Sequence, residues 1–181
     1  MSKKHGPWTI QNSEVKYKNP WIEVVENVVI RPDGCSGIFG VVKMKGGVSV
    51  LPIDEQGFVY LIEEFKFALG QDSIEAVTGG IDEDEDSLLA ARRELKEEAG
   101  IEADDWVHLG WLNPFTSAID SPAELFLARG LHFGVSDPDG TETIRMVKIT
   151  LEEAVQMVME SKITHGQSCV LILKAARFLK K

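Results

Sequence analysis

The sequence has little cysteine, no long apolar run and no signal segment. Cys35 and Cys169 are its only cysteines, too few for a disulfide framework and without the spacing of a metal site, so we expect two free thiols. No stretch approaches the roughly 20 apolar residues that cross a bilayer. The first five residues are not followed by an apolar segment of the kind that directs secretion. We therefore expect a cytoplasmic protein without a membrane partner.

Positive charge is also scarce. The 181 residues include 19 Lys and Arg against 29 Asp and Glu, which gives a formal net charge of -10 at pH 7. A surface of this sign repels the phosphate backbone of nucleic acids, so we expect no nucleic-acid partner. A small phosphate-bearing ligand would need local compensation for its charge, and a divalent cation is the simplest source of it.

The composition is that of an ordinary globular domain, with 44% hydrophobic and 27% charged residues. Residues 21–30 are rich in Val and Ile, residues 31–34 carry the turn signal Arg-Pro-Asp-Gly, and residues 38–44 would return as the second arm of a hairpin. Gly46 and Gly47 interrupt this pattern. We predict an N-terminal β segment over residues 1–45 and a main domain over residues 46–181.

Strands and helices are mixed along the main domain. The predicted strands are residues 48–53 and 58–62, joined as a hairpin by residues 54–57, and residues 106–112 and 125–131. The predicted helices are residues 86–99, 151–160 and 167–179. Gly100 lies where a left-handed cap belongs, and Thr150 lies where an N-cap belongs. This order of elements predicts an α/β or α+β domain.

Three glutamates in the first of these helices form the best candidate site. Glu94, Glu97 and Glu98 stand at positions i, i+3 and i+4, so their side chains share one helical face. Three like charges so close together are mutually destabilising, which makes a bound hard cation a sensible reason for the cluster. Carboxylate ligands point to magnesium or manganese.

A glycine turn precedes this helix and brings the end of a strand close to the three glutamates. Gly79 and Gly80 let the backbone turn tightly, so that the carbonyl of Thr78 could point at the same metal ion. Arg93 lies about 100° round the helix from its neighbour Glu94. It can reach Glu97 at i+4 or Glu85 across the loop, and we expect it to hold the loop against the helix.

Acidic stretches on helices are usually solvated surfaces, but the spacing here is specific. Gly79 is followed after five residues by Glu85, after seven more by Arg93-Glu94-Leu95, after one more by Glu97-Glu98 and after one more by Gly100-Ile101. This pattern resembles the Nudix box at every fixed position. The resemblance implies an α/β fold, a Nudix α/β/α sandwich with a mixed sheet, preceded here by a small N-terminal antiparallel β unit. It also implies metal-dependent hydrolysis of a nucleoside diphosphate linked to a second group.

The resemblance to the Nudix family also implies roles for single residues. Those that would hold the metal are Glu94 and Glu98 as principal ligands, Glu97 as a further ligand or a base, and Thr78 through its carbonyl. Those that would shape the motif are Gly79 and Gly100 at its ends and the structural pair of Glu85 and Arg93. The expected cofactor is Mg2+, with Mn2+ as an alternative.

Further segments are similar to the ADP-ribose and nucleotide-sugar pyrophosphatases of this family. They are Asn-Pro-Trp-Ile at residues 19–22, Glu-Phe-Lys-Phe at 64–67, Glu-Ala-Val-Thr-Gly-Gly at 75–80 and Ile-Thr at 163–164. The similarity implies a homodimer whose N-terminal strands cross to the partner and help to hold the nucleoside of a small-molecule substrate. It also implies that Lys66 lies near the pyrophosphate. The candidates for stacking on the base are Trp8, Trp21, Phe39 and Phe65.

The loop after the box departs from this subgroup. Where the similar enzymes carry a catalytic glutamate, this sequence has Ser121. Asp120 beside it, or Glu124 three residues on, would then be the substitute, unless Glu97 serves as the base. We assign no catalytic role to a histidine, because the four of them are scattered without ligand spacing: His5, His108, His132 and His165.

We expect an enzyme that hydrolyses the pyrophosphate bond of a nucleoside diphosphate sugar, ADP-ribose included, to a nucleoside monophosphate and a sugar phosphate. Within the same fold, the alternative is a hydrolase of dinucleotides such as NADH or of nucleoside triphosphates. From a different class comes a Nudix-like sensor that binds nucleotide without turnover, which the complete box disfavours. The remaining hypothesis is a structural protein with an incidental acidic helix, and a failure to bind divalent metal would favour it.

Overall fold

The computed structural model of the chain describes residues 2–136 and 143–180. The chain divides into two compact units. The N-terminal unit comprises Met1–Lys45 together with Asn113–Pro122, and the main unit comprises Gly46–Leu112 together with Ala123–Lys181. The segment 113–122 therefore leaves the main unit and returns to it.

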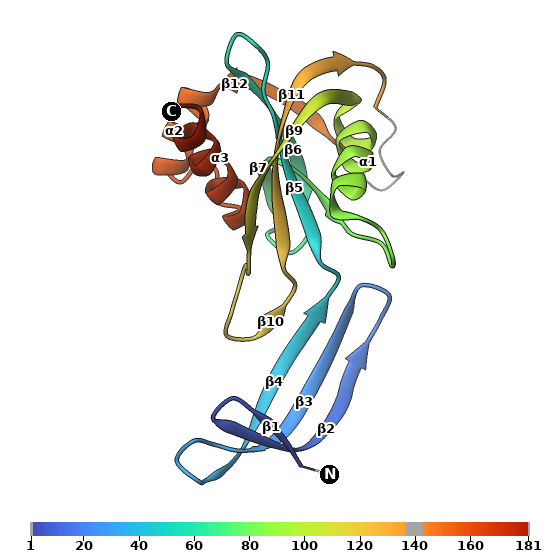
Figure 1. Cartoon of the computed structure of the whole chain (residues 1–181), viewed down its shortest axis with the longest axis vertical. Helices are drawn as coiled ribbons and strands as arrows, with labels where there is room; N and C mark the ends of the chain where they lie inside the picture. Colours follow the sequence, from blue (N-terminus) through green and yellow to red (C-terminus); the bar gives the residue numbers. More distant parts are fainter. Residues whose placement is uncertain (1, 137–142, 181) are drawn as a thin grey trace. The chain divides into compact units, whose positions relative to one another are not determined.

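The N-terminal unit is a single sheet in the order β1-β2-β3-β4-β10 (Figure 1). Its strands are β1 (Lys3–His5), β2 (Trp8–Lys18), β3 (Ile22–Ile30), β4 (Ser36–Met44) and β10 (Ile119–Asp120). Neighbours from β1 to β4 are antiparallel, and β10 runs parallel to β4. The predicted turn after β3 is confirmed, because Gly34 adopts φ 84° and donates its N–H to the carbonyl of Arg31 at 2.9 Å.

The main unit holds two sheets, in the orders β8-β5-β11-β9 and β12-β6-β7. The strands of the first are β5 (Gly47–Pro52), β8 (Val77–Gly80), β9 (Ile101–Leu112) and β11 (Ala123–Phe133). Those of the second are β6 (Phe58–Lys66), β7 (Gln71–Glu75) and β12 (Arg145–Thr150). The first sheet is mixed, since β11 runs parallel to β5 and antiparallel to β9.

Helices cover both sides of these sheets (Figure 1). They are α1 (Ser87–Ala99), α2 (Leu151–Met159) and α3 (Gly166–Leu179). Val48 and Val50 of β5 pack with Leu95 of α1, whereas Leu51 packs with Leu171 of α3. This alternation along one strand gives the α/β/α sandwich that the resemblance to the Nudix family implied.

The two helix caps that the sequence predicted, at Gly100 and Thr150, are confirmed. The Asp86 side chain caps α1 by accepting a hydrogen bond from the N–H of Leu88 at 2.9 Å, and Gly100 ends this helix at φ 63°. Thr150 and Glu153 form a capping box at the start of α2. No helix within the described ranges is long and apolar enough to cross a membrane.

One predicted pairing is wrong. The segments at 48–53 and 58–62 are strands, but they do not form a hairpin; a single bridge between Ile53 and Val59 joins them. Instead β5 pairs with β8 on one side and with β11 on the other. Strand β5 is a central strand, and its partners come from distant parts of the chain that sequence proximity does not reveal.

A partly buried histidine joins the start of α3 to strand β7. The Nδ1 atom of His165 lies 2.9 Å from Oγ of Ser168 and 3.3 Å from Oε2 of Glu75. Burial lowers the pKa of His165, and the charge of Lys66 lowers it further, although the charge of Glu75 opposes both. The helix N-terminus also disfavours a positive charge there. We therefore expect neutral His165 in the folded protein at pH 7.

We predict that the stability of the main unit falls as the pH drops below about 6.5, the ordinary histidine pKa. A lowered pKa in the folded state means that the unfolded state binds more protons, so this stability is present above that pH and is lost as the pH falls through the folded pKa. His165→Asn should reduce the loss in melting temperature between pH 7.5 and pH 5.5, whereas the exposed control His132→Asn should not. Equal losses in all three proteins would contradict the prediction.

Candidate active site

A close approach between strand β8 and helix α1 forms the centre of the candidate site. A Cβ atom placed on Gly79 would lie 1.8 Å from the carboxyl carbon of Glu94. Two atoms cannot approach so closely, so only glycine leaves room for this carboxylate against the end of β8. The side chain of Glu94 thus lies in a cradle that any larger residue at position 79 would fill.

Arg93 fastens the loop between β8 and α1. Its Nε donates to Oε1 of Glu85 at 3.0 Å, and its Nη2 donates to Oε2 of Glu85 and to the carbonyl of Gly80, each at 2.9 Å. The hydrogen bonds to Glu85 raise the pKa of Arg93 above its already high ordinary value, although burial opposes this. A bidentate pair of this kind fixes both position and orientation.

Arg93 also bridges two of the box glutamates. Its Nη1 donates to Oε1 of Glu94 at 2.6 Å and to Oε2 of Glu97 at 3.2 Å. In the described part of the chain, no three His, Cys, Asp or Glu side chains are grouped so that they could hold a metal ion. The guanidinium of Arg93 thus places a positive charge between the carboxylates of Glu94 and Glu97.

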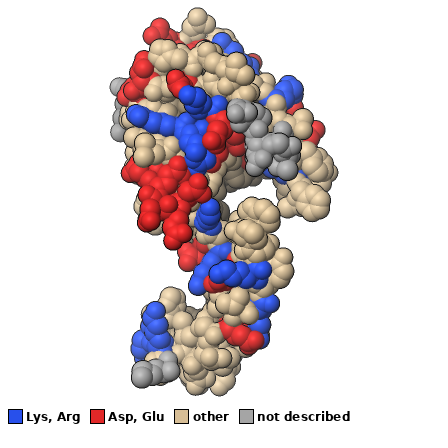
Figure 2. All heavy atoms as spheres, turned by 90° about the vertical axis from the view of Figure 1, so that its right-hand side faces the viewer, with Lys and Arg blue, Asp and Glu red and all other residues tan. Residues whose placement is uncertain are grey.

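The donors around this place nevertheless fit a hard divalent cation. Glu98 is buried, with 8% of its surface exposed, and its Oε2 accepts a hydrogen bond from the N–H of Thr78 at 3.3 Å. Glu94 lies in the cradle at Gly79, and both glutamates offer the oxygen ligands that Mg2+ and Mn2+ prefer. Figure 2 shows that Asp and Glu side chains gather on the face of the main unit that carries α1.

Lys66, at the end of β6, is half-buried beside acidic groups. Its Nζ lies 2.5 Å from Oε2 of Glu64 and 3.9 Å from Oε2 of Glu75. Burial lowers the pKa of Lys66, but the hydrogen bond to Glu64 and the charges of Glu75 and Glu98 outweigh it, so the pKa is raised. Lys66 therefore stays charged within the electrostatic reach of Glu98. Its neighbour Phe65 is 55% exposed.

The two substitutes for the missing glutamate lie in different units. Asp120 belongs to the N-terminal unit, where it pairs with Lys43 of β4. Ser121 belongs there too and donates its hydroxyl to the carbonyl of Lys45 at 2.8 Å. Glu124 belongs to β11 of the main unit, where Oε2 accepts a hydrogen bond from Ser87 at 2.9 Å and lies 3.1 Å from Nε2 of His108. Sequence spacing gave no sign of these two contacts.

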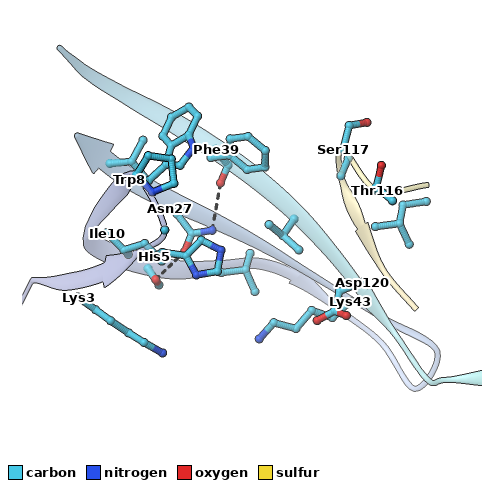
Figure 3. Close-up of a pocket in the computed structure, with 18 of the residues that line it drawn as sticks. Lys3, His5, Trp8, Ile10, Asn27, Phe39, Lys43, Thr116, Ser117 and Asp120 are labelled. Atoms are coloured by element: carbon cyan, nitrogen blue, oxygen red, sulfur yellow. Dashed lines mark hydrogen bonds between the residues drawn. The ribbon is translucent and has the colours of Figure 1, made fainter. Parts of the chain in front are cut away.

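The N-terminal unit carries a cavity of its own, of about 890 Å3 (Figure 3). Trp8 and Phe39 line it and meet edge to face, with ring centroids 5.6 Å apart. Asn27 donates its amide to the carbonyl of Phe39 at 3.1 Å. Lys43 and Asp120 lie together at another part of the lining (Figure 3). Of the other aromatic candidates, Trp21 is 74% exposed outside this lining, and Phe65 belongs to the main unit.

Comparison with known proteins agrees with these features. Residues 43–160 match the NUDIX domain, and residues 8–42 match the nucleoside diphosphate sugar hydrolase N-terminal domain. The chain is 26% identical to methanol dehydrogenase activator of Bacillus methanolicus, covering 95% of this chain and 94% of that one. It is 25% identical to ADP-ribose pyrophosphatase of Bacillus subtilis (strain 168), covering 82% and 80%. The crystal structure of an ADP compounds hydrolase shares the fold, with a TM-score of 0.85 at 22% identity over 99% and 97% of the two chains.

We predict that Gly79→Ala damages the site more than the fold. The added methyl group must displace the Glu94 carboxylate, which is the flexible end of a side chain and can move at little cost in stability. Misplacing a catalytic group by about 1 Å costs on the order of 100-fold in rate. Turnover should therefore fall by about that factor while the melting temperature hardly changes. Gly166→Ala, where an added Cβ meets nothing within 4 Å, is the control and should keep full turnover; equal turnover in the two variants would contradict the prediction.

Proposed function

The chain belongs to the NUDIX domain family, and on that premise we propose that it hydrolyses the pyrophosphate bond of a nucleoside diphosphate sugar. The products would be a nucleoside monophosphate and a sugar phosphate, with ADP-ribose or another sugar nucleotide as substrate. The observation that carries the proposal is the close approach of the Glu94 carboxylate to the backbone of Gly79, on the helix that also carries the buried Glu98. The match of residues 8–42 to the N-terminal domain of nucleoside diphosphate sugar hydrolases supports the substrate class.

We propose Mg2+ as the cofactor, with Mn2+ able to replace it. Glu94 and Glu98 would be the principal ligands, with Glu97 and the Thr78 carbonyl as further ones. When bound, the metal ion would neutralise pyrophosphate oxygens and lower the pKa of the attacking water. The contact of Arg93 with Glu94 and Glu97 would then have to loosen, so Arg93 would stay with Glu85 and Gly80 as the structural clasp of the motif. Gly79 and Gly100 shape the two ends of that motif.

Two further residues of the main unit, Lys66 and Glu124, would bind the pyrophosphate and accept a proton, respectively. Lys66 is charged, and we assign it to the pyrophosphate. Glu124 is our candidate for the base that accepts a proton from water, because it belongs to the sheet against which α1 packs. Asp120, in the N-terminal unit, and Glu97, held by Arg93, are the alternatives.

For the nucleoside we propose the cavity of the N-terminal unit. Its aromatic pair of Trp8 and Phe39 offers faces and edges for a base, and Asn27 offers polar atoms beside them. Exposed Trp21 and Phe65 are further candidates for stacking. A homodimer would account for the exposure of large apolar side chains on strands of this unit, Tyr17 and Ile38 among them, and light scattering in solution would test it.

The structural likeness to an ADP compounds hydrolase favours one alternative within the same chemistry. A dinucleotide of the NADH type contains the same ADP half, and a nucleoside triphosphate contains the same kind of anhydride. A sensor without turnover is less favoured, because the box is complete from Gly79 to Ile101.

We predict that wild type with Mg2+ releases a nucleoside monophosphate from sugar-linked diphosphates. The assay compares ADP-ribose, other nucleotide sugars, dinucleotides and nucleoside triphosphates, with the products separated by chromatography. Chelation should abolish the activity, and Glu98→Gln should lower kcat by about 100-fold or more, because it removes a charge that the cation needs. Glu152→Gln, on the exposed face of α2, is the matched control and should behave as wild type.

The same assay separates binding from chemistry. Phe39→Ala should raise KM for the preferred substrate by about ten-fold with little change in kcat, because stacking on a base is worth about 1–3 kcal/mol. A preference for dinucleotides or triphosphates would move the proposal to the alternative substrate class. Binding of nucleotide without turnover of any compound would replace it with the sensor.

A further inference from the structure

Three side chains from three elements of the main unit meet at Glu124. Ser87, at the first position of α1, donates its hydroxyl to Oε2 of Glu124 at 2.9 Å. Nε2 of His108, on β9, lies 3.1 Å from the same oxygen. The ring of His108 also packs on Phe126, with centroids 5.1 Å apart. One carboxylate oxygen of Glu124 is thus held from two sides.

The strand register places Glu124 on the face of the sheet that α1 covers, and α1 carries Glu94, Glu97 and Glu98. Glu124 pairs directly with Val48 of β5, and Val48 pairs directly with Gly79 of β8. Directly paired residues point to the same side of a sheet, and neighbouring strands lie about 4.8 Å apart. Gly79 is the residue against which Glu94 lies, so Glu124 stands two strands, or about 10 Å, from that contact on the same side.

The contact with His108 depends on an irregularity in β9. His108 pairs with Phe126 and Trp111 pairs with Glu124, so β9 has one more residue than β11 between the two pairs. Gly110, at φ 93°, takes up the extra residue. A bulge of this kind re-aims neighbouring side chains. Here the bulge lets the ring of His108 pack on Phe126 while its Nε2 atom faces the carboxylate of Glu124.

We propose that His108 and Ser87 are positioning residues for hydrolysis, because they hold Glu124 as the proton acceptor for the attacking water. In the step, a water O–H bond breaks and its proton passes to a carboxylate oxygen of Glu124. The water oxygen forms a bond to phosphorus, and the anhydride P–O bond breaks with its electron pair on the departing phosphate. This inference rests on the proposed function, and it selects Glu124 over Asp120 and Glu97.

The test is a double-mutant cycle on the full chain, with the preferred substrate and Mg2+. Glu124→Gln should lower kcat by about 100-fold or more, the range for a lost general base. His108→Phe keeps a ring against Phe126 but removes the nitrogen, and it should lower kcat by about ten-fold with KM unchanged. His108→Gln restores an N–H donor and should recover most of that loss. In the Glu124→Gln background, His108→Phe should cost nothing more, because it acts only through Glu124.

His132 supplies the matched control, since it pairs with Asp104 at 2.9 Å on the exposed surface of the same two strands. His132→Phe should keep wild-type kcat and KM. Three results would overturn the inference and leave the proposed function standing. They are an equal loss of kcat from His108→Phe in the wild-type and Glu124→Gln backgrounds, no recovery of kcat in His108→Gln, and a weaker response of Glu124→Gln to Mg2+. An inactive wild type would remove both.

Discussion

The contact between the Glu94 carboxylate and the backbone of Gly79 is the constraint on which the rest of the site depends. It requires a residue without a side chain at the end of β8 and a glutamate two turns into α1. The hydrogen bonds of Arg93 to Glu85 and Gly80 tie the intervening loop to α1, which helps to keep the strand and the helix at this distance. The buried position of Glu98 beside Thr78 follows from the same docking of α1.

Charge compensation at this contact explains the role of Arg93. Three glutamates on one helical face repel one another, and in this conformation the guanidinium of Arg93 satisfies Glu94 and Glu97. A divalent cation would offer the same carboxylates a stronger and more compact charge. Lys66 adds a second positive group that is charged and in the electrostatic field of Glu98. An acidic chain can therefore bind a phosphate-bearing substrate without a broad basic surface.

The sequence predicts a structural feature where that feature depends on residues close to one another in the chain. Gly100 and Thr150 cap helices through contacts within a few residues, so the end of α1 and the start of α2 could be predicted. Prediction fails where the signal is long-range: β5 takes its neighbours from β8 and β11, and nothing in its own segment shows this. The contact of His108 with Glu124 depends on that strand order and on a bulge, so it too was missed. Likewise Asp120 and Glu124 are close in the sequence but fall in different units, because residues 119–120 pair with β4.

We propose that the carboxylates beside Gly79 hold a divalent cation. Titration of the protein with Mn2+, followed by electron paramagnetic resonance of the free ion, tests it without any substrate. Wild type should show one or more sites whose Mn2+ affinity falls by about ten-fold or more in Glu94→Gln, since the charge of the ligands sets cation affinity. Equal Mn2+ binding by wild type and variant would contradict this proposal.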